Sequence, residues 1–422
     1  MTAAPLRIGI VGAGPGGLML GALLRKQGLP FTLFELRARP TDAEAAKPAG
    51  SLDLHEGSGL AAIRELGLFD KFSGLTGDCS QALKIADKKG AILYAEEDEG
   101  ASVGGEQRPE IARNKLGQLL LEELEPASVR WEHKLVSAEL LGQEVKLDFG
   151  SNGVHTFDLV VGADGAWSKV RPLLTDAMPQ YAGQQNITAS VRGITSRYPH
   201  LAELVGTGTF MALGDRHGIV VQRAAGDTAR LYTLINTKDE QFATTHALRE
   251  KSAAEAKTIV LEAEDAAFKD FGPVLRELIT AACDDETAAE PGAAVEVRPM
   301  YTLCTESEPK GPRWESKAGV TLLGDAAHLM PPNGEGVNMA MQDALELSRV
   351  LAKAHTAVSE ESVPPGEALQ AAVREYETAM FGRVEEVAGE TEQMLSVMYG
   401  SENGAEEMVK FFKAMMAGEH QN

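Results

Sequence analysis

The chain has 422 residues, of which 44% are hydrophobic and 24% are charged. This length predicts two or three domains, and the composition predicts a soluble globular protein with a large core. The 40 basic and 62 acidic residues give a net charge of −22, so we expect no nucleic-acid or membrane partner. Cys79, Cys283 and Cys304 are widely separated and predict no disulfide framework and no metal site. Because no signal peptide or membrane-spanning run is visible, we expect a cytoplasmic protein.

Hydrophobic periodicity predicts mixed helices and strands along the chain. The N-terminal region gives a β-α-β unit made of Leu6–Val11, the turn Gly12–Gly17, Leu18–Lys26 and Phe31–Phe34. Further elements are expected as a helix at Asn114–Leu124, strands at Val129–Leu135, Val145–Phe149 and Phe157–Val161, an antiparallel sheet at Gln180–Asn236, a linker at Asp284–Ala294, a strand at Gly319–Leu323, a long helix from Asn338 to about Lys353 and a helical region at Glu367–Met416.

The glycine turn after the first strand carries the first functional signal. Gly12, Gly14 and Gly17 have the Gly-x-Gly-x-x-Gly spacing, which allows a tight turn, close approach of a pyrophosphate and close packing of the following helix. Glu35 ends the second strand, where a carboxylate can accept hydrogen bonds from a ribose. The arrangement predicts bound FAD or NAD, because this carboxylate would repel the 2′-phosphate of NADP. An ordinary glycine turn is the alternative.

Two later segments also place a carboxylate at a strand end. Asp164 lies in Val-Gly-Ala-Asp-Gly, where ligands of open α/β sheets bind, although a simple β-turn with a helix cap has the same pattern. Asp325 follows another strand in Leu-Leu-Gly-Asp-Ala-Ala-His, and the loop after it brings Gly334 and Gly336 to the start of a long helix. Glycines let this backbone lie against a flat ring such as a flavin, whose reduced form is negative near the free N–H groups of a helix start. A glycine-rich helix entry without a ligand is the alternative.

In combination, GAGPGG, VGADG and LLGDAAHLMPP resemble the group A FAD-dependent monooxygenases, typified by p-hydroxybenzoate hydroxylase, and are most similar to the tetracycline-inactivating flavin monooxygenases. The resemblance implies an α/β fold in which a Rossmann-like FAD-binding domain (residues 1–177 and 296–366) carries an inserted antiparallel-β substrate-binding domain (178–295) and a C-terminal bridging helix (367–422). It implies that Glu35 holds the adenosine ribose, that Arg113 and Asp325 contact the ribityl and phosphate region, and that Asp53, Asp164, Gly334, Gly336, Val337 and Asn338 also contact the cofactor.

The resemblance does not extend to the residues that contact the drug in the tetracycline enzymes, which fall on Thr188, Thr209 and Tyr232 here. Lys47 stands beside the position of an arginine that approaches the nicotinamide cofactor. Arg192 matches an arginine called catalytic in salicylate-hydroxylase-like members, and a solvent-facing strand arginine is the alternative. The expected lining of the substrate site, for which core packing is an equal explanation, is Thr188, Arg192, Met211, Gln222 and Tyr232.

These signals together predict an enzyme in which transient NADPH or NADH reduces tightly bound FAD. Oxygen would then add to the flavin C4a as a hydroperoxide and pass one atom to an aromatic or polyketide-like small molecule. Binding of the nicotinamide cofactor is expected to be transient because the chain has a single glycine-rich dinucleotide motif. The alternatives are a FAD-dependent dehydrogenase or oxidase on the same scaffold and a non-catalytic ligand-binding flavoprotein. We expect a monomer or homodimer.

Overall fold

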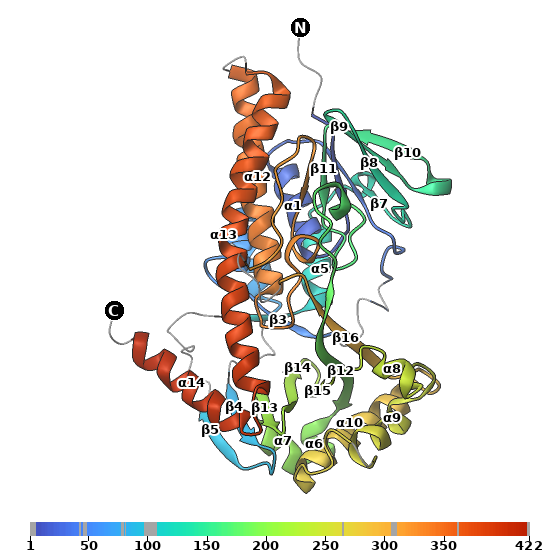
Figure 1. Ribbon diagram of the computed structural model, residues 1–422, viewed down its shortest axis with the longest axis vertical. Helices are drawn as coiled ribbons and strands as arrows, with labels where there is room; N and C mark the ends of the chain where they lie inside the picture. Colours follow the sequence, from blue (N-terminus) through green and yellow to red (C-terminus); the bar gives the residue numbers. More distant parts are fainter. Residues whose placement is uncertain are drawn as a thin grey trace.

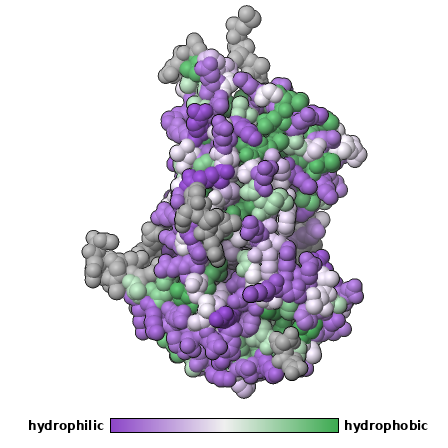
Figure 2. Space-filling model, viewed as in Figure 1, coloured by the Kyte–Doolittle hydropathy of each residue, from purple (hydrophilic) through white to green (hydrophobic). Residues whose placement is uncertain are grey.

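The computed structural model describes residues 6–41, 44, 49–76, 80, 82–96, 108–263, 266–304, 310–360 and 363–419. Figure 1 shows two bodies, each built around a sheet, with one long helix running beside both of them. Within the described residues, no helix is both long and apolar enough to cross a membrane. Hydrophilic residues cover most of the face seen in Figure 2, and a hydrophobic area lies on the side that carries a small three-stranded sheet.

The first body contains a parallel five-stranded sheet in the order β17-β11-β1-β2-β7. Its strands are Val320–Leu322, Leu159–Gly162, Ile8–Val11, Phe31–Phe34 and Val129–Arg130, respectively. The strands β1 and β11 are buried throughout, as expected for a parallel sheet covered on both faces. The helices of this body are α1 (Pro15–Lys26), α3 (Gly59–Leu66), α4 (Phe69–Ser73), α5 (Arg113–Leu121), α11 (Asp325–His328) and α12 (Gly336–Glu360).

An antiparallel three-stranded sheet packs beside this body through aromatic side chains. It consists of β8 (Ser137–Leu141), β9 (Glu144–Asp148) and β10 (Val154–Phe157), in the order β10-β9-β8. Phe34 of the parallel sheet stacks on Phe149 at a centroid distance of 4.3 Å and meets Phe157 edge-on at 5.8 Å. These contacts continue the hydrophobic core of the first body into the small sheet.

The second body is a seven-stranded sheet in the order β16-β12-β15-β14-β13-β4-β5, antiparallel except for the β13–β4 pair. Its strands are Glu296–Thr302, Gln180–Arg192, Thr228–Asn236, His217–Ala224, Thr209–Gly214, Leu83–Asp87 and Ile92–Glu96, respectively. One face is covered by α6 (Ile194–Arg197), α7 (Pro199–Val205), α8 (Phe242–Thr245), α9 (Ala253–Leu261) and α10 (Pro273–Ala289). Three strands of this sheet, β4, β5 and β16, lie outside residues 178–295, so the sheet extends beyond the range expected for the substrate-binding domain. The domain boundaries themselves stay a prediction.

The C-terminal region forms two helices instead of one. α13 (Pro365–Tyr399) packs along α12 and reaches β13 and β14 of the second body. The chain then turns at Gly400, and α14 (Gly404–Glu419) packs on β4, β5 and β13. A Cβ atom on Gly404 would lie 2.2 Å from the carbonyl oxygen of Met398, so a glycine is needed where the second helix starts.

Two local expectations were wrong. The segment expected as a linker at Asp284–Ala294 is helical as far as Ala289, because α10 continues through it. Its alanine and glutamate residues favour a helix, and the buried Asp285 anchors it through ion pairs with Arg192 and Arg197. The strand expected at Val129–Leu135 ends after Arg130, because Glu132 adopts a positive φ of 59° that breaks the extended backbone.

Candidate cofactor and substrate site

Each of the three glycines of the first turn occupies its position for a different structural reason. Gly12 has a φ of 110°, and a Cβ atom there would lie 2.2 Å from the carbonyl oxygen of Ala163. A Cβ atom on Gly17 would lie 2.0 Å from the carbonyl oxygen of Gly12. Gly14 caps α1 and has open space, with nothing within 4 Å of a Cβ position. The start of α1 therefore has free backbone N–H groups and an open approach, as pyrophosphate binding requires.

Glu35 lies beside this turn at the end of β2. Its side chain is 4% exposed, and it accepts hydrogen bonds from the Ala13 N–H at 2.8 Å and from the Arg37 side chain at 2.7 Å. Burial alone would raise the pKa of Glu35, but the hydrogen bonds from Arg37 and Ala13 outweigh it and hold the pKa below the usual value. An ionised acceptor is thus fixed where the adenosine ribose is expected.

Asp164 and Asp325 follow the ends of the neighbouring strands β11 and β17. Asp164 accepts a hydrogen bond from the Lys169 N–H at 2.7 Å through one oxygen, while its other oxygen, Oδ1, is buried without a partner. The side chain of Asp325 is exposed to solvent, and desolvation by the surrounding protein raises its pKa. An orphaned acceptor and an exposed carboxylate at the carboxyl ends of parallel strands are the features of a ligand site in an open α/β sheet.

Arg113 connects these strand ends to the second body. It is the first residue of α5, and its backbone N–H donates to the Gly50 carbonyl at 3.0 Å. Its charge acts on the carboxylate of Asp325 and on the hydroxyl of Tyr232. The charge of Arg113 therefore partly offsets the desolvation that raises the pKa of an aspartate and a tyrosine in other segments of the sequence.

A hydrogen-bonded cluster joins β3 (Ser51–Asp53), which pairs with β6 (Glu110–Ala112), to the glycine loop before α12. The buried Asn338 accepts from the His55 N–H at 2.9 Å and donates to the Asp53 carbonyl at 3.0 Å. The His55 ring lies between two carboxylates, with Nε2 2.9 Å from Asp53 and Nδ1 3.1 Å from Glu335. Of the loop residues expected to contact the flavin, Asn338 is buried, whereas Gly334 and Gly336 are exposed and Val337 is half-buried.

The charge of His55 gives a pH prediction. Burial opposes its protonation, but the two carboxylates dominate and raise the pKa of His55 to about 9. Because the folded-state pKa lies above the unfolded value, the stabilisation is complete below about pH 6.5 and is lost as the pH rises through about 9.

We expect His55→Gln to unfold at a lower temperature at pH 6 and to show a weaker loss of stability between pH 7 and 9, measured by thermal denaturation. His200→Gln, which removes an exposed His–Glu pair, is the control, and an unchanged pH profile in His55→Gln would contradict the assignment.

The expected substrate residues lie on the face of the seven-stranded sheet opposite its helices. Thr188 and Tyr232 are paired neighbours on β12 and β15, and Thr209 and Gln222 are paired neighbours on β13 and β14. A Cβ atom on Gly50 would lie 2.9 Å from the Tyr232 hydroxyl, so this face meets the first body directly. Met211 shares the face and packs against the cluster formed with α13 and α14.

Arg192, the expected catalytic residue, lies at the end of β12. Its guanidinium is 3.0 Å from Asp285 and 3.6 Å from Glu286, both on α10. The structure therefore places it in an ion-pair cluster at the sheet edge, and its catalytic role stays a prediction. The Nδ1 atom of His217 accepts a hydrogen bond from the Asn236 N–H at 3.1 Å. Lys47 lies outside the described residues.

Sequence reasoning missed a buried charge network beneath the Gly-Asp motif. Asp343 on α12 is fully buried and lies 2.6 Å from His328, 2.9 Å from Arg383 of α13 and 3.0 Å from the Gly324 N–H. The network fixes the backbone next to Asp325. The Asp at the eighth position of a helix gives no signal in the sequence, because its partners are fixed only by the packing of α12 on α13.

Comparison with known proteins agrees with this geometry. A family model described as "FAD binding domain" matches residues 6–363. The chain belongs to this family. Monooxygenase penA of Penicillium thymicola is 33% identical over 95% of this chain and 97% of its own length. Monooxygenase asqM of Emericella nidulans is 31% identical over 97% and 98%, and 6-hydroxynicotinate 3-monooxygenase of Pseudomonas fluorescens is 27% identical over 82% of each chain.

Solved structures show the same fold. HpxO of Klebsiella pneumoniae, complexed with FAD and uric acid, superposes with a TM-score of 0.70 at 18% identity, covering 98% of this chain and 93% of HpxO. Tetracycline destructase Tet(51) superposes with a TM-score of 0.66 at 17% identity, covering 99% and 98%. The predicted fold and the resemblance to group A flavin monooxygenases are therefore confirmed. The protein is a FAD-dependent monooxygenase.

Proposed function

We propose that this enzyme uses NADPH or NADH to insert one oxygen atom from O₂ into an aromatic or polyketide-like molecule. The proposal rests on one contact between the two bodies. Tyr232 lies on the face of the seven-stranded sheet opposite its helices (the Tyr232 face), and its hydroxyl meets Gly50, whose carbonyl accepts from the Arg113 N–H beside the cofactor crevice. A substrate held on this face would lie against a flavin held by Asp325 and Arg113. The relative named 6-hydroxynicotinate 3-monooxygenase supports a small aromatic substrate.

The residues of the crevice fit FAD. FAD held here would supply hydride acceptance from the nicotinamide cofactor and activation of O₂, which is chemistry that protein side chains lack. The α1 N-terminus would hold the pyrophosphate, Glu35 the adenosine ribose, and Asp164 and Asp325 the middle of the cofactor. The Gly334–Asn338 backbone would lie at the pyrimidine edge, where its N–H groups favour negative charge. The chain orients the two reactants and excludes water from between them.

The test measures nicotinamide oxidation and oxygen transfer on the same FAD-loaded protein. Phenols, heteroaromatic compounds and polyketide-like aromatics are added under air with NADPH or NADH, and hydrogen peroxide is measured alongside. We expect at least one compound to accelerate oxidation with little peroxide and to gain one labelled atom from ¹⁸O₂. Oxidised product without the label would contradict the proposal and would instead indicate a dehydrogenase or oxidase.

A further inference from the structure

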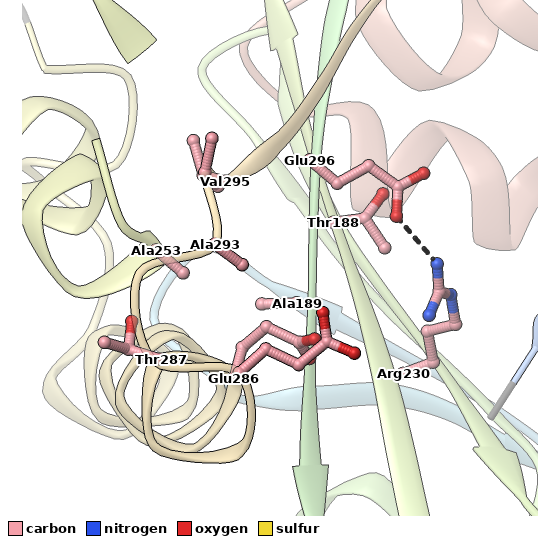
Figure 3. Close-up of a pocket in the computed structure, with 11 residues that line it drawn as sticks. Thr188, Ala189, Arg230, Ala253, Glu286, Thr287, Ala293, Val295 and Glu296 are labelled. Atoms are coloured by element: carbon pink, nitrogen blue, oxygen red, sulfur yellow. Dashed lines mark hydrogen bonds and ion pairs between the residues drawn. The ribbon is translucent and has the colours of Figure 1, made fainter. Parts of the chain in front are cut away.

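A pocket of about 140 Å³ opens at the edge of the seven-stranded sheet, at the point where β16 ends and β12 becomes the edge strand. β16 pairs with β12 only as far as the Thr188–Glu296 pair, while β12 continues to Arg192. Beyond Thr188 the strand edge is covered by α10, which brings Glu286 and Thr287 to the pocket. Figure 3 shows Thr188, Arg230 and Glu296 on the sheet side and Glu286 reaching toward them from the helix.

Two polar atoms of the pocket residues are buried without a hydrogen-bond partner. Arg230 pairs with Glu296 at 3.0 Å through Nη2, but its Nε–H donor has no partner. Glu286 reaches Arg192 at 3.6 Å through Oε1, but its Oε2 acceptor has no partner. Leaving such groups unpaired in a native protein is unfavourable and calls for a bound partner. The unpaired set includes one donor and one acceptor.

The pocket adjoins the proposed substrate face. Thr188 lines the pocket and pairs with Tyr232 across the sheet. The Arg230 guanidinium carbon lies 5.8 Å from the centre of the Tyr232 ring. Two residues before Thr188 on the same strand face, the Oδ1 acceptor of Asn186 is also buried without a partner. A molecule bound on the Tyr232 face could therefore extend a polar group into this pocket.

The charges select the kind of group that fits. Three glutamates and one arginine line the pocket, and Glu286 and Glu296 also pair with Arg192 and Arg298. A carboxylate could accept from Arg230 Nε, but it could not donate to Glu286 Oε2 and would repel that carboxylate. A neutral group that accepts from Arg230 Nε and donates to Glu286 Oε2 satisfies both orphaned atoms. We propose that this pocket binds the polar end of the substrate, and that this end is a neutral carboxamide or lactam and not a carboxylate. The inference rests on the proposed monooxygenase function, because it treats the pocket as part of the substrate site.

The test compares head groups of equal size by calorimetric titration of the full-length, FAD-loaded protein. Benzamide, benzoate and benzylamine are the probes. We expect benzamide to bind at least about tenfold more tightly than benzoate. Glu286→Gln should weaken benzamide binding and narrow this ratio, because the amide side chain no longer repels the anion. Arg230→Met should weaken benzamide binding by removing the Nε donor. Glu277→Gln, on the same helix but paired with the exposed His200, is the control and should change neither affinity.

Several results would overturn the proposal. Benzoate could bind as tightly as benzamide, benzylamine could bind more tightly than benzamide, or no probe could bind at about 10 mM. The ratio of benzamide to benzoate affinity could be unchanged in Glu286→Gln, or a crystal structure could show benzamide bound outside this pocket. Calorimetry detects binding without turnover, so these outcomes are independent of nicotinamide oxidation and ¹⁸O incorporation. Failure of the pocket assignment and failure of the proposed function are therefore distinguishable.

Discussion

Gly17→Ala is expected to abolish stoichiometric FAD binding and to destabilise the protein by about 3 kcal/mol. The added Cβ atom would lie 2.0 Å from the Gly12 carbonyl oxygen. That oxygen belongs to a backbone which is itself held against Ala163, so the turn cannot relax without moving the strand end of β11. The ratio of flavin to protein absorbance measures retained cofactor, and urea unfolding measures the free energy of unfolding.

Gly14→Ala is the matched comparison within the same motif. No atom lies within 4 Å of the added methyl group, and the φ of −72° suits alanine. We expect its stability to stay within about 1 kcal/mol of the parent, the usual scale for an N-cap change. FAD affinity should still fall, because the methyl group fills the space through which a pyrophosphate approaches α1. Full FAD affinity in Gly14→Ala would show that the phosphates bind elsewhere.

The cofactor side of the molecule was predictable because its signals are local. The glycines of the first turn and the carboxylates Glu35, Asp164 and Asp325 each stand at the end of a short hydrophobic strand. Strands of a parallel sheet align their carboxyl ends, so local patterns also fix which residues meet in space. The structure brings these four strand ends to one edge in the order β17-β11-β1-β2. Whether each residue touches FAD stays a prediction.

The substrate side was less predictable because its contacts depend on packing between distant segments. The end of α10, from Asp284 onward, was expected to be part of a linker, since polar and small residues give no hydrophobic stripe there. The buried Asp285 pairs with Arg192 at the end of β12 and with Arg197 at the end of α6, and no local pattern predicts either contact. The same holds for β4, whose pairing with β13 crosses more than a hundred residues of sequence, and for β5, which joins the sheet by pairing with β4. The pocket around Arg230 depends on the end of α10, which supplies Glu286 and Thr287, so no local sequence pattern predicted it.

The second large effect is expected for Asp343→Asn, which removes the anion at the centre of the buried network. Burial alone would raise the pKa of Asp343, but the charges of His328 and Arg383 lower it, and Asp343 in turn raises the pKa of His328. Without the carboxylate, the buried His328 loses its partner and the half-buried Arg383 keeps only Glu346. Breaking a buried ion pair in this way destabilises proteins by about 3–5 kcal/mol. FAD affinity should fall as well, because the Gly324 N–H that precedes Asp325 loses its charged acceptor.

The pH dependence separates this network from ordinary packing. A depressed Asp343 pKa contributes stability that is present above the unfolded value near 4 and is lost as the pH falls through the folded value. A raised His328 pKa contributes stability that is complete below about 6.5 and is lost as the pH rises through its folded value. Asp343→Asn should therefore flatten the stability profile on both sides, as measured by urea unfolding from pH 3 to 9.

Glu375→Gln is the control for Asp343→Asn, because it removes an ion pair across the same two helices at the surface. Glu375 lies 3.2 Å from Lys353, and the two side chains are 59% and 73% exposed. Such a pair contributes at most about 1 kcal/mol, so this variant should keep the parental stability, pH profile and FAD content. If Asp343→Asn behaved like Glu375→Gln, the buried charges would be dispensable. The position of Asp325 would then have to be set by the backbone of β17 alone.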